Sequence, residues 1–201
     1  MKKNVIALVL TAVVLFALAF GLNKEAGANA QEHHLWLMQT LLPGSEEFTL
    51  ETYSGEDANI RSVHKAENGY VIETVTYGYA SEITMMIGVN LEGKVTGLVV
   101  DEAHETFGLG NQVLTDHVFL SQFLNSEGSF AVATEGADAF SGATDSTTGA
   151  TNAAADDENA VEVDAITGAT VTSKAVVRCV NSAVAYVTGA DVSTGATSWG
   201  G

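Results

Sequence analysis

Strand signals dominate up to about residue 101, and at Ile83, Met85, Ile87 and Val89 apolar residues alternate in the period of two that is typical of β-strands. Strands are predicted at Ile60–Ala66, Tyr70–Tyr77, Ile83–Asn90 and Lys94–Asp101. Asn-Gly within Glu67-Asn68-Gly69 is expected to supply positive φ in one hairpin, and Leu91-Glu92-Gly93 closes another. In the last strand, Val95 and Val99 are expected on one face, with Leu98 and Val100 on the other. The pattern predicts an antiparallel sheet with one face against a core.

Three segments have the longer apolar period of amphipathic helices. Leu35–Leu42 is closed by Pro43-Gly44, which breaks a helix. The second helix follows Asn111, a candidate N-cap, and has apolar residues at Val113, Leu114, Val118, Leu120, Phe123 and Leu124. The third, Val171–Val187, carries a stripe of small apolar residues and follows a short strand at Ala160–Val163. The fold class predicted is therefore α+β, an antiparallel sheet with packed helices.

An uncharged apolar run, Val5–Leu22, predicts one N-terminal transmembrane helix ahead of this domain. Lys2 and Lys3 favour a cytoplasmic N-terminus and an extracytoplasmic remainder. The alternative is a cleaved signal peptide with its cleavage site at Ala28-Asn29-Ala30. A retained anchor is the preferred interpretation, because the run is longer than the apolar part of most signal peptides.

One seven-residue phrase, Asp-x-x-(Ser/Thr)-Gly-Ala-Thr, occurs four times. Its copies are Asp138–Thr144, Asp145–Thr151, Asp164–Thr170 and Asp191–Thr197. The first two lie in a stretch of about 126–160 that is rich in Ala, Gly, Ser, Thr and Asp, which predicts a low-complexity insert. The fourth lies in the Gly-rich tail, residues 188–201. Only the third is followed by an amphipathic helix.

Charge and cysteine usage exclude several classes of function. Six basic and 25 acidic residues follow Leu22, a net charge of −19, which argues against nucleic-acid binding. The single cysteine, Cys179, excludes an internal disulfide and is expected to be a core residue. The histidines have no metal-like spacing, so no metal site is predicted. No pair of residues indicates a catalytic acid and base, so the chain is not expected to be a catalyst on its own.

The third phrase lies between a strand and a helix. At a helix N-terminus, amide groups without partners and the positive end of the dipole accommodate a phosphate. Thr170, Thr172 and Ser173 place hydroxyl groups there. The residues alone also allow a simpler role, in which Thr170 or Thr172 is only an N-cap.

The segment DAITGATVTSKAVV resembles the flavinylation motif of FMN-binding domains in the G subunit of the Rnf complex and in the C subunit of the sodium-pumping NADH:quinone reductase. His104–Gly110 resembles the region of that family that lies against the flavin, although Phe107 stands where the family has proline and the spacing within His-Glu-Thr is one residue shorter. Leu41–Gly44, Gly78–Ala80 and the run from Ile83 to Val100 match as well. The resemblance covers about residues 1–125 and 160–187.

The resemblance implies that FMN is joined through its phosphate to Thr170, by a flavin transferase that uses FAD. It also implies a cofactor-binding set consisting of Asp164, Thr167, Gly168, Ala169, Thr172 and Ser173, with His104, Glu105, Thr106, Gly108, Leu109 and Gly110. Thr144, Thr151 and Thr197 are further candidates for flavinylation. The domains expected are an anchor (1–23), a linker (24–34), an FMN-binding domain (35–187) and the tail.

By this resemblance the chain is expected to be an electron-transfer subunit of an Rnf-type complex, held in the cell membrane by one span. Its partners would be the other membrane subunits and the flavin transferase. One alternative is a free-standing extracytoplasmic electron carrier with several flavins. Another is a non-redox secreted interaction domain, in which the repeated phrases are only linker.

Overall fold

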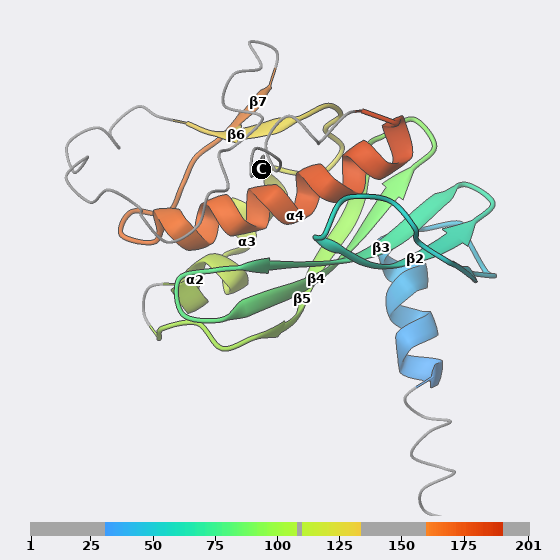
Figure 1. Cartoon of the computed structure of the whole chain (residues 1–201), viewed down its shortest axis with the longest axis horizontal. Coiled ribbons are helices and arrows are strands. Elements are labelled where there is room, and N and C mark those ends of the chain that lie inside the picture. The colour runs from blue at the N-terminus through green and yellow to red at the C-terminus, as the bar shows by residue number, and fades with distance from the viewer. Residues whose placement is uncertain (1–30, 108–109, 134–159, 191–201) are drawn as a thin grey trace, which may run out of the picture. The chain divides into compact units, whose positions relative to one another are not determined.

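A five-stranded antiparallel sheet forms the centre of the computed structural model, which describes residues 31–107, 110–133 and 160–190 (Figure 1). The strands follow one another in sequence order: β1 (Thr49–Glu51), β2 (Ile60–Ala66), β3 (Gly69–Tyr77), β4 (Glu82–Asn90) and β5 (Val95–Ala103). Each neighbouring pair is antiparallel. The predicted α+β class and the four predicted strands are confirmed.

One long helix, α4 (Thr170–Thr188), packs on one face of the sheet over β3 and β4 (Figure 1). Its apolar stripe is buried against alternate residues of β4, among them Ile83, Met85 and Ile87, none of which is exposed. Apolar burial of this kind contributes about 25 cal/mol per Å² to folding. A left-handed Gly189 (φ 69°) ends the helix, as is common at helix C-termini. The predicted third helix is confirmed.

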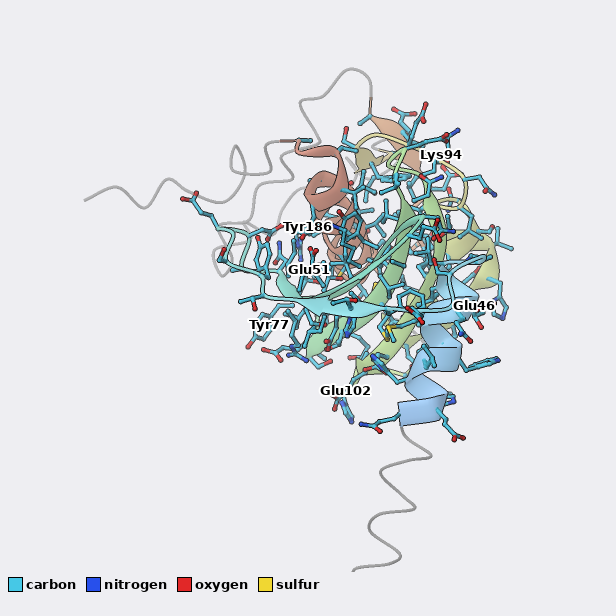
Figure 2. All side chains as sticks on the ribbon, turned by 90° about the vertical axis from the view of Figure 1, so that its right-hand side faces the viewer. Glu46, Glu51, Tyr77, Lys94, Glu102 and Tyr186 are labelled. Carbon is cyan, nitrogen blue, oxygen red and sulfur yellow. The ribbon has the colours of Figure 1, made fainter. Side chains whose placement is uncertain are left out.

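Polar contacts join α4 to the edge strand of the sheet. The Tyr186 hydroxyl donates to Glu51 of β1 (3.2 Å), and Figure 2 shows the two side chains close together. Burial, and then the bond to the Glu51 carboxylate, raises the pKa of Tyr186. The same carboxylate forms an ion pair with Lys65 of β2 (3.3 Å). The edge strand is thus attached to both the helix and its neighbour.

Two details of the predicted sheet are wrong. Neither Asn68 nor Gly69 has a positive φ. Gly69 is instead needed for close approach, because a Cβ there would collide with the Val89 carbonyl. In β5 the register shifts between the pairs Gly88–Gly97 and Val89–Val95, so the extra residue Thr96 reverses the alternation. Val95 therefore packs on the core side together with Leu98 and Val100 rather than with Val99.

A helix at residues 31–41 precedes the sheet and ends before Pro43-Gly44, as predicted. It begins in an N-terminal unit, Met1–Met38, and its last turn belongs to the unit Gln39–Gly201. In the second unit, Leu41 lies against Gly88 and Gly97, where any side chain would collide with its backbone. The Thr96 hydroxyl donates to the Leu41 carbonyl (2.6 Å). These glycines let the chain at Leu41 lie close against the sheet.

The second predicted helix is two short helices, so that prediction is wrong. α2 spans Gly110–Thr115 and α3 spans His117–Ser121. Asp116 between them is extended (φ −79°, ψ 105°), and its carboxylate accepts from the amides of Val118 (2.8 Å) and Phe119 (3.0 Å). Asn111 lies within α2 rather than at a cap. Asp116 caps a new helix, so the helix is interrupted although the apolar period continues across it.

Two short parallel strands complete the described structure: β6 (Phe130–Val132) and β7 (Val161–Val163). β6 falls in the stretch whose composition predicted an insert. The Asn181 side chain of α4 donates to the Phe130 carbonyl (2.9 Å) and accepts from its amide (2.8 Å). Phe130 itself is fully buried. β7, predicted from sequence, leads directly into the third copy of the phrase.

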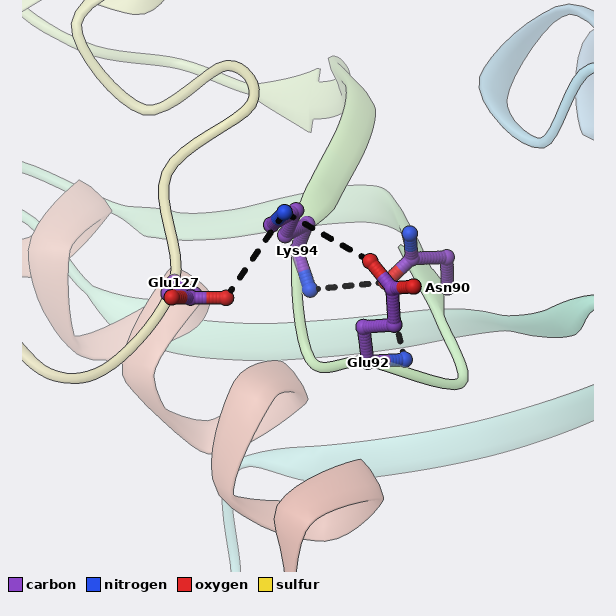
Figure 3. A network of polar contacts seen from close by, with 4 residues as sticks. All are labelled: Asn90, Glu92, Lys94 and Glu127. Carbon is purple, nitrogen blue, oxygen red and sulfur yellow. Dashed lines mark hydrogen bonds and ion pairs between the residues drawn. The ribbon is translucent and has the colours of Figure 1, made fainter.

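The turn between β4 and β5 is closed by a small polar network (Figure 3). The Asn90 side chain accepts from the amides of Glu92 (3.0 Å) and Lys94 (2.9 Å), while Gly93 takes a positive φ of 85°. The Lys94 ammonium lies 3.5 Å from Glu92 and 3.9 Å from Glu127. Such exposed ion pairs stabilise a fold by about 1 kcal/mol or less.

The predicted anchor at residues 1–23 lies outside the described residues. Within the described part of the chain, no helix combines the length and apolar character needed to cross a membrane.

Candidate functional site

The third copy of the phrase forms the turn into α4. Thr170 is the first residue of the helix and is half-buried. Gly168 has a positive φ of 82°, which favours glycine there, and the Ala169 amide closes the turn on the Ile166 carbonyl (2.9 Å). Thr167 and Gly168 are exposed. The strand, turn and helix predicted around this phrase are all present.

Ser173 holds the turn in shape. Its hydroxyl accepts from the Ile166 amide (3.3 Å) and donates to the Ala169 carbonyl (3.1 Å), and the side chain is fully buried. Its own amide also donates to the Ala169 carbonyl (2.9 Å). Ser173 therefore directs its hydroxyl to the local backbone and does not offer it to a ligand.

Asp164 lies at the opposite end of the phrase, directly after β7, and is exposed. Its backbone is held by the side chain of Gln122, which accepts from the Asp164 amide (2.8 Å) and donates to its carbonyl (3.3 Å). No sequence pattern singled out Gln122, because its role depends on the packing of α3 beside the phrase.

Glu105 is the central side chain of the site. One carboxylate oxygen accepts from the amides of Ala80 (3.0 Å) and Ser81 (3.1 Å). The other accepts from the Tyr79 amide (3.3 Å) and from the Thr172 hydroxyl (3.0 Å). A half-buried carboxylate thus joins the turn after β3 to the first turn of α4.

The rest of the predicted His104–Gly110 segment is arranged around Glu105. The His104 amide donates to the Ser81 hydroxyl (2.9 Å), and the Thr106 carbonyl accepts from the Asn111 amide (3.2 Å). The side chains of His104 and Thr106 are exposed, as is 91% of Phe107. Gly110 is buried at the start of α2. Gly108 and Leu109 lie outside the described residues, as do Thr144, Thr151 and Thr197.

The start of α4 suits a phosphate. No described side chain caps this end of the 19-residue helix, and Thr172 and Ser173 direct their hydroxyls to the protein. The first amides of the helix and its positive dipole end are therefore available beside the Thr170 hydroxyl. A phosphate joined to Thr170 would meet these amides, and the exposed turn gives access to it.

A hollow of about 270 Å³ lies beside this segment, on the sheet. Its lining is polar and includes two carboxylates: Arg61, Ser81, Glu82, Thr84, Glu102 and His104. FMN carries a negative phosphate, so the two carboxylates of this lining suit it less well than the start of α4 does. Among the described residues, no cluster of histidine, cysteine, aspartate and glutamate could hold a metal ion.

Residues 78–156 and 151–185, more than half of the chain, match the FMN-binding domain family. The chain belongs to this family. The two matched ranges contain Glu105 and the third phrase, and they support FMN as the cofactor of the FMN-binding domain described here.

Several relatives carry names that concern ion-translocating complexes. The chain is 32% identical over 117 residues to the G subunit of the Na(+)-translocating ferredoxin:NAD(+) oxidoreductase complex of Acetobacterium woodii, covering 58% of this chain and 47% of that protein. It is 32% identical over 119 residues to the proton-translocating counterpart of Clostridium ljungdahlii, covering 59% and 53%. It thus spans about half the length of these relatives.

A relative from Methanosarcina acetivorans, named as the G subunit of an ion-translocating oxidoreductase complex, is 28% identical over 204 aligned positions, covering 92% of this chain and 96% of that protein. Among solved structures, the crystal structure of Shewanella oneidensis NqrC is similar with a TM-score of 0.42 and 20% identity, covering 72% of this chain and 65% of that one.

Proposed function

We propose that this chain is a membrane-anchored flavoprotein that carries covalent FMN and transfers electrons as a component of an Rnf-type ion-translocating ferredoxin:NAD oxidoreductase complex. The observation that carries the proposal is Thr170 at the uncapped start of α4, within the part of the chain that matches the FMN-binding domain family. The names of the relatives supply the kind of complex.

The covalent step is a phosphoester formation at Thr170. The threonine hydroxyl attacks the FMN phosphorus of FAD, the pyrophosphate bond breaks, AMP leaves with the bridging oxygen, and the hydroxyl proton is released. No electrons are exchanged in this step, and a flavin transferase supplies the catalytic groups. When bound, FMN supplies the redox chemistry, and the protein fixes its position and tunes its potential.

The cellular arrangement follows from the N-terminal sequence. Residues 5–22 would cross the membrane once, and Lys2 and Lys3 would keep the N-terminus in the cytoplasm. The FMN-binding domain would then lie on the extracytoplasmic side. A covalent bond there prevents loss of the cofactor to the outside. Electrons would arrive from and leave to the other membrane subunits, which are the expected partners.

The proposal is tested by intact-mass measurement after co-expression of the chain with a flavin transferase. The wild-type chain is expected to gain the mass of FMN less one water. Thr170→Ala should abolish this increment because it removes the attacking hydroxyl, whereas Thr170→Ser keeps a hydroxyl at the same place and should retain modification. A wild-type chain without any increment would show that the proposal is wrong.

The repeated phrase favours a second candidate, a free-standing extracytoplasmic carrier with several flavins. Thr144, Thr151 and Thr197 end the other three copies with the same aspartate offset. The same mass spectra decide this: two or more increments, of which Thr170→Ala removes only one, would support the multi-flavin carrier. A non-redox secreted interaction domain would carry no covalent flavin at all.

A further inference from the structure

Glu105 makes an unusually complete set of contacts for one carboxylate. It accepts from the backbone amides of Tyr79, Ala80 and Ser81 and from the Thr172 hydroxyl, at 3.0–3.3 Å. Hydrogen bonds to an ionised acceptor are roughly twice as strong as neutral ones. Because the carboxylate is directed into the protein, it is not free to bind a flavin.

Two glycines enclose this carboxylate. A Cβ at Gly78 would collide with one of its oxygens, and a Cβ at Gly110 would collide with the other. The Gly110 Cβ would also come within 2.8 Å of the Thr172 hydroxyl. Gly78 follows β3 and Gly110 begins α2, so two separate segments close around Glu105. The four hydrogen bonds hold the carboxylate in place, and both segments can approach it this closely because they have glycine there.

Thr172 connects the held carboxylate to the start of α4. Thr172 is fully buried, and its hydroxyl donates to Glu105. Ser173, the next residue, ties the helix to the turn at Ile166 and Ala169. Thr170 lies two residues before Thr172 in the same helical turn. The backbone on both sides of Thr170 is thus held, through Thr172 by Glu105 and through the turn by Ser173.

We propose that Glu105 is a positioning residue, which acts through Thr172 to present the Thr170 hydroxyl for flavin transfer and to hold the attached flavin in one orientation. This inference rests on the proposed function, and it gives Glu105 a role other than contact with the cofactor. Glu105 exchanges no proton and forms no bond in the transfer; the atoms move as stated for Thr170.

The test is a time course of flavinylation of the full chain with a purified flavin transferase and FAD, followed by intact mass. In Glu105→Gln one acceptor oxygen becomes an amide that faces donors, so the rate should fall roughly tenfold to a hundredfold, as expected for a misplaced reacting group. The flavin fluorescence anisotropy of the modified fraction should also fall, because the attached ring is held less firmly.

Three further variants separate positioning from folding. Thr172→Val removes the hydroxyl donor at nearly constant volume, so it should lower both the flavinylation rate and the anisotropy. Thr172→Ser keeps the donor and should have the wild-type rate and anisotropy. Glu102→Gln is the matched control, since this exposed glutamate lies three residues before Glu105. It should behave as wild type. Circular dichroism measures whether each variant is folded. If Glu105→Gln does not fold, the comparison of Thr172→Val with Thr172→Ser tests the proposal instead.

The outcomes distinguish the two proposals. If the wild-type chain gains no flavin, the proposed function is wrong and the role of Glu105 falls with it. The other outcome is that the wild-type chain is modified and that Glu105→Gln and Thr172→Val, both folded, have the same rate and anisotropy as the wild type. In that case only the proposed role of Glu105 is overturned.

Discussion

Three neighbouring hydroxyl side chains at the start of α4 have three different environments. Thr170 is half-buried beside uncapped amides, Thr172 is buried against Glu105, and Ser173 is buried against its own turn. The sequence placed all three at a helix N-terminus, and that prediction is confirmed. It could not assign their separate contacts, because the partner of Thr172 lies 67 positions away in the chain.

Cys179 gives a test of burial at the residue scale. The thiol is fully buried in α4, as predicted, and lies 3.3 Å from the Thr76 hydroxyl. Burial raises its pKa, although the nearby threonine hydroxyls oppose the shift. The folded state therefore favours the protonated thiol. Its contribution to stability is present below the ordinary thiol pKa of about 8.5 and is lost as pH rises above that value.

We expect the free energy of unfolding of the wild-type chain to fall more steeply between about pH 8 and pH 10 than that of Cys179→Ala. Urea unfolding of both proteins across this range measures the difference, and the other titrating groups cancel in the subtraction. Parallel pH profiles for the two proteins would contradict the raised pKa.

At the scale of elements, the strands were predictable and their irregularities were not. Alternation of apolar residues located β2 to β5, but Thr96 adds a residue to β5 and reverses its faces. The apolar period also continues across Asp116, so it predicted one helix where the structure has α2 and α3. Each deviation depends on a single residue, the extra Thr96 in β5 and the capping Asp116 before α3, and the apolar period does not reveal either of them.

Asp116 is expected to stabilise the domain as the cap of α3. Asp116→Ala leaves the amides of Val118 and Phe119 without their acceptor and should cost about 1 kcal/mol of unfolding free energy. Asp116→Asn keeps a capping oxygen and should lower the unfolding free energy by only about a few tenths of a kcal/mol. Chemical denaturation measures both. Equal losses would mean that the charge of Asp116, and not its capping bonds, stabilises the helix.

On the scale of the whole molecule, negative charge is the dominant surface property. Six basic and 25 acidic residues follow Leu22. Of the described basic side chains, Arg61, Lys65 and Lys94 already form ion pairs with carboxylates. The carboxylates in excess repel one another across the folded surface. This repulsion destabilises the compact state at low ionic strength.

Salt is therefore expected to stabilise the domain. Raising NaCl from about 20 mM to about 500 mM shortens the screening length from roughly 20 Å to roughly 4 Å and should raise Tm by about 2–4 °C. Differential scanning calorimetry measures the shift. A variant with Glu46, Glu47 and Glu67 replaced by glutamine removes three exposed charges and should show a smaller shift (Figure 2 labels Glu46). A Tm that falls with salt would contradict this account.

The bond between Thr172 and Glu105 also bears on the order of events during biosynthesis. It closes a loop of 67 residues and requires that α4 has docked on a sheet made earlier in the chain. Closing long loops is among the slower steps of folding. Thr170, the proposed acceptor, thus reaches its final surroundings only when the domain is essentially complete. Attached flavin would then report on finished molecules, and maturation would come after folding rather than during synthesis.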